Sequence, residues 1–372
     1  MSKALARVDG SNVVLSPPGA TETVIPGRWL RDHGDDPGSV DPDSHQRVVD
    51  TFSIPRDVAP LELTQSGDRL AIAWSGGAST SNSLADLMAI AGNRRGPAPT
   101  TGVAISIDPD LKLWSSPHEI SLLPAVALDD DGLWRDALVH LHRHGWVMFD
   151  DVELGKESVE RLGSRLGYVR RTIFGDIWTL SPDVQDHLDS AYTTVEIEVH
   201  TDCTYTHDAP GLMVFAQQER GGDGGDSVLV DGFAAARDFA ARQPEAADLL
   251  TRFDIRGRYV EPGVNLVSER PPLRVDAGGV LRQVSFNNYD RAPVLPDEEW
   301  VDDVIDAYAD FHSVLVEPDR ALRLPWQPGR VLIFDNWRLL HGRTSYSGAR
   351  SFLGFYANHE DLESTLRLHG LS

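Results

Sequence analysis

Three side chains of this sequence have the types and the spacing needed to bind one metal ion. His200 and Asp202 are separated by a single residue, and His341 lies far downstream, at the end of Asn336-Trp337-Arg338-Leu339-Leu340-His341. Two imidazoles and one carboxylate on one side of a metal leave its other positions open, and non-haem iron(II) oxygenases use this ligand set. We therefore interpret His200, Asp202 and His341 as candidate metal ligands and catalytic residues.

The residues before Asp202 alternate between apolar and polar side chains. In Val195-Glu196-Ile197-Glu198-Val199-His200-Thr201-Asp202 this alternation has the two-residue period of a strand. His200 and Asp202 should then project to the same side. His341 follows the apolar run Val331-Leu332-Ile333-Phe334, which predicts a second strand that brings the third ligand. A histidine next to an aspartate is more often structural, so the metal interpretation depends on all three residues together.

A cation suited to a co-substrate follows the third ligand. Iron(II) in such a site needs a bidentate co-substrate, and a 2-oxo acid can provide it. If that acid has a second carboxylate, a planar guanidinium group can bind it. Arg350 begins Arg350-Ser351-Phe352-Leu353-Gly354-Phe355-Tyr356, where a strand would turn Arg350 and Tyr356 to the same face. The alternative is a surface arginine on an edge strand.

Composition excludes several classes of protein. The chain has 372 residues, of which 41% are hydrophobic, and a formal net charge of −23. Such a surface repels nucleic acid and anionic membranes and favours cationic small molecules, although it also serves solubility. No run approaches the ~18 apolar residues of a membrane span, and the first residues lack the apolar stretch of a signal peptide, so we expect a cytoplasmic protein. The single cysteine, Cys203, excludes an internal disulfide.

Short strands bounded by turn residues dominate the chain. Residues 1–95 indicate a small β-rich domain, residues 96–120 a connector across the surface, and residues 121–372 a larger domain. Apolar residues have helical spacing at Leu133–Arg143, Ser158–Leu166, Ala234–Phe253 and Glu298–Leu315. We predict a mainly β fold with helices, in which a double-stranded β-helix, or jelly roll, encloses the ligand and follows the small domain.

At these residues the sequence resembles the carnitine-biosynthesis oxygenases, namely trimethyllysine dioxygenase and γ-butyrobetaine dioxygenase, within the taurine-dioxygenase-like superfamily. The resemblance extends over nearly the whole chain. The motifs that carry it are Trp29-Leu30-Arg31-Asp32-His33, His45-Gln46-Arg47, Ala191-Tyr192-Thr193-Thr194, His200-Thr201-Asp202, Gly224-Gly225-Asp226-Ser227, Val230-Asp231-Gly232-Phe233, Phe286-Asn287-Asn288-Tyr289-Asp290-Arg291 and Phe334-Asp335-Asn336-Trp337-Arg338-Leu339-Leu340-His341-Gly342-Arg343.

The resemblance implies an iron site and a co-substrate site. Iron(II) would be bound by His200, Asp202 and His341, and the distal carboxylate of 2-oxoglutarate by Arg350 with the hydroxyl of Ser227. Dioxygen is then the oxidant, and we expect ascorbate as reductant. The implied reaction is hydroxylation of an unactivated C–H bond.

The resemblance also implies a substrate site. The aromatic residues that enclose a trimethylammonium group in the butyrobetaine enzymes correspond to Phe174, Trp178, Tyr192 and Tyr356, and ring faces are suited to a cation that cannot donate hydrogen bonds. Phe174 stands where those enzymes have tyrosine. For Phe174 and Trp178, core packing is the alternative. Asn287, Asn288 and Arg291 would orient the polar end of the substrate, and a turn held by asparagine side chains is an equally good interpretation.

The sequence departs from the family at the residues that usually bind zinc. Family members usually bind a structural zinc in the N-terminal domain through cysteines after the Trp-Leu-Arg-Asp motif and a later histidine. Here the cysteine positions read Gly34-Asp35-Asp36-Pro37-Gly38-Ser39. His33 and His45 remain, but structural zinc strongly favours thiolates. We therefore expect no zinc, and we expect a homodimer, as is usual in the family.

The sequence thus predicts an enzyme that acts on a small molecule and binds neither nucleic acid nor membrane. Its substrate would be amino-acid-like and carry a trimethylammonium group. One alternative is a tailoring oxygenase of secondary metabolism that acts on a non-quaternary amino acid or amine. A more distant one is an inactive jelly-roll binding module.

Overall fold

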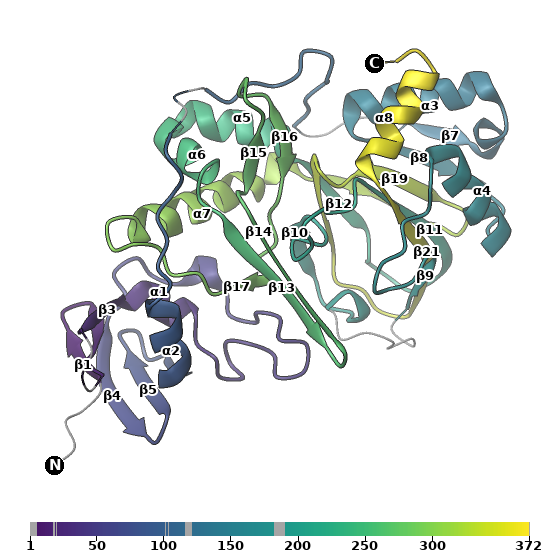
Figure 1. Ribbon diagram of the computed structural model, residues 1–372. Coiled ribbons are helices and arrows are strands. Elements are labelled where there is room, and N and C mark those ends of the chain that lie inside the picture. The colour runs from purple at the N-terminus through teal and green to yellow at the C-terminus, as the bar shows by residue number, and fades with distance from the viewer. Residues whose placement is uncertain are drawn as a thin grey trace.

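Two β-sheets face each other in the larger part of the molecule (Figure 1). The computed structural model describes residues 6–17, 19, 21–100, 102, 104–115, 121–181 and 190–371. The larger sheet has the strand order β7 (Leu122–Pro124), β8 (Trp146–Asp150), β19 (Val331–Asp335), β11 (Leu212–Gly221), β21 (Ala349–Ala357) and β9 (Trp178–Leu180). The smaller sheet has the order β10 (Ile197–His200), β20 (Leu339–Arg343), β12 (Ser227–Asp231) and β18 (Leu322–Leu324). Two facing sheets of this kind form a jelly roll.

The larger sheet is buried on both faces. In β19, Val331 and Ile333 belong to the core on the outer face, whereas Leu332 and Phe334 belong to the core between the sheets. This explains why β19 is a continuous apolar run. The outer face is covered by α3 (Asp131–His144), α4 (Lys156–Leu166) and α8 (His359–Leu368), which contribute buried apolar residues to the same core (Figure 1).

The smaller sheet is covered on its outer face by α5 (Gly232–Arg242), α6 (Pro244–Leu250) and α7 (Val301–Leu315). On β20, Leu340 packs toward these helices and Leu339 toward the other sheet. His341, two residues after Leu339, therefore faces the space between the sheets. The prediction of a single helix at Ala234–Phe253 is wrong in one respect, because the structure has two helices there, separated at Gln243. Pro244 lacks a backbone N–H and begins a new helix.

Further strands lie beside the smaller sheet. They are β13 (Ile255–Glu261), β14 (Val264–Arg270), β15 (Leu273–Val275), β16 (Leu281–Val284) and β17 (Arg291–Ala292). β13 and β14 form a hairpin, and β17 pairs with β13. Short 3-10 helices complete the chain at η1 (Thr51–Ser53), η2 (Ala125–Leu128), η3 (Ser190–Tyr192) and η4 (Pro318–Arg320). None of the helices among the described residues is long and apolar enough to cross a membrane.

The N-terminal part forms two small sheets of its own (Figure 1). They contain β1 (Ala6–Asp9), β2 (Asn12–Leu15) and β3 (Thr23–Pro26), then β4 (Pro60–Ser66), β5 (Arg69–Trp74) and β6 (Ser79–Ser83), with α1 (Gly27–Asp32) and α2 (Leu84–Ala91) beside them. Their core includes Trp29 and Trp74, but Leu295 and Val301 also belong to it. The later chain thus helps to bury the N-terminal core, and the boundary at residue 95 stays a prediction.

Candidate active site

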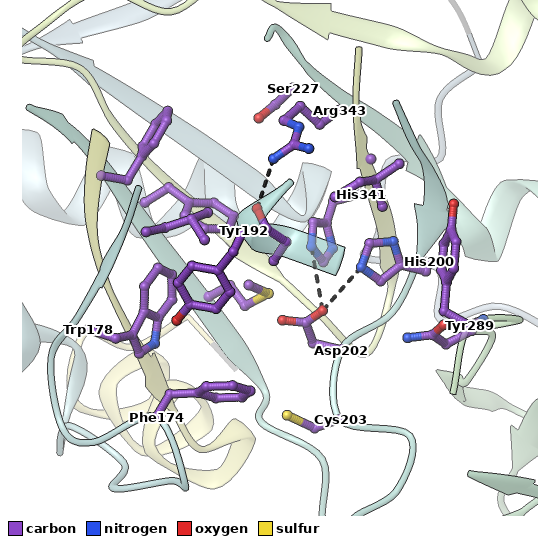
Figure 2. Close-up of a pocket in the computed structure, with 18 of the residues that line it drawn as sticks. Phe174, Trp178, Tyr192, His200, Asp202, Cys203, Ser227, Tyr289, His341 and Arg343 are labelled. Atoms are coloured by element: carbon purple, nitrogen blue, oxygen red, sulfur yellow. Dashed lines mark hydrogen bonds and ion pairs between the residues drawn. The ribbon is translucent and has the colours of Figure 1, made fainter. Parts of the chain in front are cut away.

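The three predicted metal ligands meet at adjacent strands of the smaller sheet. His200 ends β10 and lies directly opposite His341 of β20 in the antiparallel register. Asp202 follows two residues beyond, and its Oδ1 lies 3.3 Å from Nε2 of His200 and 3.6 Å from Nε2 of His341. Figure 2 shows both imidazoles directed at this carboxylate. One ligand atom from each residue fits within 4.8 Å of the others, so the group could bind one metal ion through nitrogen, oxygen and nitrogen.

Neighbouring groups fix two of these side chains. Nδ1 of His200 lies 2.8 Å from the carbonyl oxygen of Glu198, which leaves Nε2 for a metal. The hydroxyl of Tyr356 donates to Oδ2 of Asp202 at 2.8 Å. The backbone N–H of Asp202 donates to Oδ1 of Asn336 at 2.9 Å. The carboxylate is therefore held with Oδ1 toward the two histidines.

The charges of the site suit a metal ion. Burial raises the pKa of Asp202, but His341, His200 and the Tyr356 hydroxyl outweigh burial and lower it to about 2. Burial and the neighbouring His200 lower the pKa of His341 to about 3. The pKa of His200 is raised, because its hydrogen bond to Asp202 and the charge of Asp202 outweigh burial. An ionised carboxylate and a neutral imidazole are the ligand forms that a metal requires.

A pocket between the two sheets contains most of the predicted site residues. The metal-ligand candidates line it together with Phe174, Trp178, Tyr192, Ser227, Asn287, Arg350 and Tyr356. Asn288 and Arg291 are not among the lining residues. Nη2 of Arg291 instead lies 2.5 Å from Oδ2 of Asp32, and its Nε donates to Oδ1 of Asn288 at 3.0 Å. The structure thus directs these two side chains toward the N-terminal part.

Arg350 and Ser227 fit the far carboxylate of a 2-oxo acid. The guanidinium of Arg350 is buried, and its Nη2 donates to the carbonyl oxygen of Gly225 at 3.1 Å. Its Nε is a buried donor without a hydrogen-bond partner among the residues that the structure describes. Burial and the nearby Arg343 lower the pKa of Arg350 to about 9, so it is a cation at neutral pH. Oγ of Ser227 accepts a hydrogen bond from Nε1 of Trp326 at 2.8 Å, which leaves its own proton to donate.

Aromatic rings form one side of the pocket. The rings of Trp178 and Tyr356 have centroids 5.7 Å apart, and Phe174 and Tyr192 lie on the same side of the metal-ligand candidates as Trp178 (Figure 2). Trp178 is also packed among the buried residues between the sheets. It therefore both lines the pocket and belongs to the core. It pairs with Gly354 of β21, where a Cβ atom would overlap its ring. Gly354 therefore makes room for Trp178.

The turn at Asn287 supports the alternative interpretation of that residue. Oδ1 of Asn287 accepts hydrogen bonds from the backbone N–H groups of Tyr289 at 2.9 Å and Asp290 at 3.3 Å. This side chain holds a turn, as asparagine often does. Asn287 also lines the pocket, so it fixes the loop that carries Tyr289 and Asp290 into the pocket wall.

Several lining residues escaped the sequence analysis. Among them are Gln46, Cys203, Tyr205, Tyr289, Asp290 and Arg343. Arg343 donates to the carbonyl oxygens of Ala191, Thr193 and Val195 at 3.0, 2.7 and 2.8 Å. It therefore holds the segment before β10 against β20. The motifs around Gln46, Asp290 and Arg343 were visible in the sequence, but nothing local placed these residues in the pocket.

The two N-terminal histidines considered for zinc differ in their surroundings. His33 is buried, and its ring is stacked on that of Trp29 with the ring centroids 4.2 Å apart. Its Nδ1 lies 2.8 Å from the Trp29 carbonyl oxygen. His45 has a positive φ of 57° and lies in a loop. Neither belongs to a group of three potential ligands within the described part of the chain. The expectation that this domain folds without zinc stays a prediction.

Known proteins are similar in sequence to this chain over most of its length. Residues 110–356 match the family described as "Taurine catabolism dioxygenase TauD, TfdA family". Trimethyllysine dioxygenase of Meyerozyma guilliermondii is 28% identical over 383 residues, covering 97% of this chain and 94% of the relative. The mitochondrial trimethyllysine dioxygenase of Rattus norvegicus is 30% identical over 358 residues, covering 92% and 82%. γ-Butyrobetaine dioxygenase of Homo sapiens is 31% identical over 224 residues, covering 57% and 56%.

A solved structure shares the fold. A protein of Burkholderia xenovorans, provisionally described as an alpha-ketoglutarate-dependent taurine dioxygenase, matches with a TM-score of 0.51 at 17% identity, over 66% of this chain and 92% of that chain. The predicted jelly roll is thereby confirmed. The family match includes the segments of His200, Asp202 and His341. The chain belongs to the TauD, TfdA family and is an iron(II)- and 2-oxoglutarate-dependent dioxygenase.

Proposed function

We propose that this dioxygenase hydroxylates an unactivated C–H bond of a small, amino-acid-like substrate with a trimethylammonium group, of the trimethyllysine or γ-butyrobetaine type. One observation carries the proposal. The candidate metal ligands and a set of aromatic rings line the same pocket. The relatives named trimethyllysine dioxygenase, similar over more than nine-tenths of the chain, support the same substrate class.

In this proposal each part of the pocket has one task. His200, Asp202 and His341 bind iron(II), and Arg350 with Ser227 binds the distal carboxylate of 2-oxoglutarate. The chemistry that these groups supply when bound is the insertion of one atom of dioxygen into the substrate's C–H bond, while the other atom enters the succinate that is formed with carbon dioxide. Ascorbate would keep the iron reduced. The protein holds the target carbon near the metal site and limits the access of water.

The aromatic side of the pocket suits a quaternary ammonium group. Such a cation has no hydrogen to donate, so ring faces bind it better than hydrogen-bond acceptors, at roughly 0.5–2 kcal/mol for each ring. Trp178 and Tyr356 have their rings 5.7 Å apart, and the Tyr356 hydroxyl is engaged by Asp202. Phe174 and Tyr192 would complete the enclosure. Asn287 would contribute to the polar end, whereas the contacts of Asn288 and Arg291 with Asp32 and Thr51 give them a positioning role instead.

Product analysis tests the proposal. The iron(II)-loaded enzyme is incubated with 2-oxoglutarate, dioxygen and ascorbate, and with Nε-trimethyllysine or γ-butyrobetaine in separate reactions. Mass spectrometry should detect the gain of one oxygen atom on one of them, with an equal amount of succinate. Succinate formation without oxidation of either substrate would contradict the substrate class. It would instead favour the secondary-metabolism alternative, which acts on a non-quaternary amine. The inactive binding module has no support, because the chain belongs to a family of enzymes.

Three further predictions belong to this proposal. They are the homodimer, the cytoplasmic location, and the division into residues 1–95, 96–120 and 121–372. The core of the N-terminal part supports the first boundary, and Leu295 and Val301 of the later chain help to fill that core. Light scattering on the purified protein would measure the number of subunits directly.

A further inference from the structure

The strand that carries His200 is irregular just before this candidate ligand. β10 pairs with β20 at Ile197 and again at His200, and over this interval the register advances by three residues on β10 but by two on β20. The extra residue makes a β-bulge. Gly342 of β20 lies against it, where a Cβ atom would be 2.6 Å from the Ile197 carbonyl oxygen. A bulge interrupts the regular ladder of hydrogen bonds, so its backbone groups need other partners.

Tyr289 supplies the partner of one backbone group in this bulge. Its hydroxyl accepts a hydrogen bond from the backbone N–H of Glu198 at 2.9 Å. The carbonyl oxygen of Glu198 lies 2.8 Å from Nδ1 of His200. The Tyr289 ring also meets the His200 ring edge to face, with the ring centroids 6.0 Å apart, and Figure 2 shows the two side chains next to each other. A single residue, Glu198, thus connects the Tyr289 hydroxyl to the candidate ligand.

The backbone of Tyr289 is held from two sides. Its N–H donates to Oδ1 of Asn287 at 2.9 Å, within the same turn. Its carbonyl oxygen accepts a hydrogen bond from the backbone N–H of Arg47 at 3.0 Å. Arg47 belongs to the N-terminal part, so this part of the chain helps to place Tyr289.

Thr51 extends the connection with the N-terminal part. Its Oγ1 donates to Oδ1 of Asp32 at 2.7 Å. The same oxygen lies 3.1 Å from Nη2 of Arg47 and 3.1 Å from Nη2 of Arg291. It also lies 3.3 Å from Nδ2 of Asn288. Asn288 and Arg291 come just before and just after the middle of the turn, so Thr51 joins both to the N-terminal part.

The orientation of a metal-bound imidazole depends on the group that its other ring nitrogen contacts. For His200 this group is a carbonyl in a bulge, and the Tyr289 hydroxyl holds the same residue. We propose that Tyr289 is a positioning residue for the metal site, an inference that rests on the proposed role of His200 as a metal ligand. Tyr289 fixes the residue that orients His200, and the N-terminal part keeps Tyr289 in place through Arg47 and Thr51.

Tyr289→Phe tests the proposal, because it removes the hydroxyl and keeps the ring. Calorimetric titration of the metal-free enzyme with Co(II), in the presence of 2-oxoglutarate, measures the affinity of the site without turnover. The dissociation constant should rise about tenfold, as expected when a group that supports a metal ligand is lost. The visible absorption of bound Co(II), which depends on the geometry of its ligands, should change as well.

Tyr308→Phe is the matched control. It removes another buried tyrosine hydroxyl, one without a hydrogen-bond partner in the described part of the chain, and it should retain both the affinity and the spectrum. A purely structural role of Tyr289 would lower the melting temperature of the metal-free enzyme and leave the Co(II) spectrum as it is. An unchanged affinity or an unchanged spectrum in Tyr289→Phe would therefore overturn the positioning role.

Thr51→Val tests the contribution of the N-terminal part. It keeps the shape of the side chain and removes the hydroxyl, and Thr51 does not line the pocket that contains the metal-ligand candidates. The dissociation constant for Co(II) should rise about threefold, less than in Tyr289→Phe, because the effect is transmitted through the turn. An unchanged value would overturn this contribution. If Tyr289→Phe does not fold, Thr51→Val decides.

His200→Ala distinguishes failure of this inference from failure of the proposed function. If His200→Ala binds Co(II) as tightly as the unaltered enzyme, His200 is not a metal ligand, and the proposed metal site is wrong. If His200→Ala loses Co(II) and Tyr289→Phe binds it normally, the metal site stands and only the positioning role is overturned.

Discussion

The metal-ligand region and the turn that carries Tyr289 and Asp290 into the pocket wall are built in different ways. His200 and His341 lie opposite each other on paired strands, and Asp202 follows two residues after His200. At the turn, Asp290 accepts hydrogen bonds from Gln46, which is 244 positions away, and from Thr204. The geometry of the candidate metal site thus depends on the register of one sheet, whereas this part of the pocket wall depends on loops and on the N-terminal part. We expect changes in the first region to affect turnover on every substrate.

The largest effect is expected in the metal-ligand region. Asp202→Ala removes the only carboxylate of the proposed ligand set and should reduce turnover by more than about 100-fold. Succinate release and bound iron after loading measure it. Glu198→Gln is a useful control, because it keeps the carbonyl that contacts His200. Full activity of metal-replete Asp202→Ala would contradict the metal assignment.

Substitution of Arg350 should have the next largest effect, and this effect should be limited to the binding of 2-oxoglutarate. Arg350→Ala removes the buried cation and should raise the KM for 2-oxoglutarate by about 100-fold, because a charged hydrogen-bond pair is lost. The affinity for trimethyllysine should change little. Arg323→Ala, on the exposed side of β18, removes an arginine outside the pocket and should leave both values unchanged. A larger loss of affinity for the substrate than for 2-oxoglutarate would contradict the assignment of Arg350 to the co-substrate.

Changes on the aromatic side of the pocket should weaken the binding of the substrate more than the binding of 2-oxoglutarate. Gly354→Ala places a methyl group where the Trp178 ring lies, so the ring must move. We expect about a tenfold loss in affinity for a quaternary substrate, with 2-oxoglutarate affected far less. Trp178→Ala should act in the same direction, at some cost in stability, because Trp178 is also buried core. Parallel losses for substrate and co-substrate would argue against the enclosure.

The smallest effect is expected at the junction with the N-terminal part, and it depends on pH. Burial lowers the pKa of His33 to about 3 from its ordinary value of 6.5. Because the pKa is lower in the folded state, this histidine contributes stability above pH 6.5 that is lost as the pH falls toward 3. The melting temperature should therefore fall between pH 7 and 5.

A histidine variant separates this contribution from that of the metal ligands. The pKa of His341 is also lowered to about 3, so His341 contributes a slope of the same sign. His33→Gln should reduce the pH dependence of the melting temperature but not remove it. An unchanged slope in His33→Gln would show that the junction does not contribute.

Sequence alone predicted the parts of the site whose signals are local. The alternation before Asp202 identified β10, and helices α3, α4 and α7 followed from their spacing. The apolar run before His341 is β19 of the larger sheet, whereas His341 itself lies on the next strand, β20, of the smaller sheet. Helices α1 and α2 were missed, because they have only 6 and 8 residues and show too few turns of periodicity. The contacts of Gln46 with Asp290 and of Arg291 with Asp32 join distant segments. No local pattern encodes them.

The most direct test of the account is a competition between two substrates in one reaction. Enzyme loaded with iron(II) receives equal amounts of Nε-trimethyllysine and γ-butyrobetaine, with 2-oxoglutarate, dioxygen and ascorbate, and mass spectrometry follows both products. We predict that at least one of the two compounds gains one oxygen atom, with a matching amount of succinate. Succinate formation with oxidation of neither compound would contradict the account.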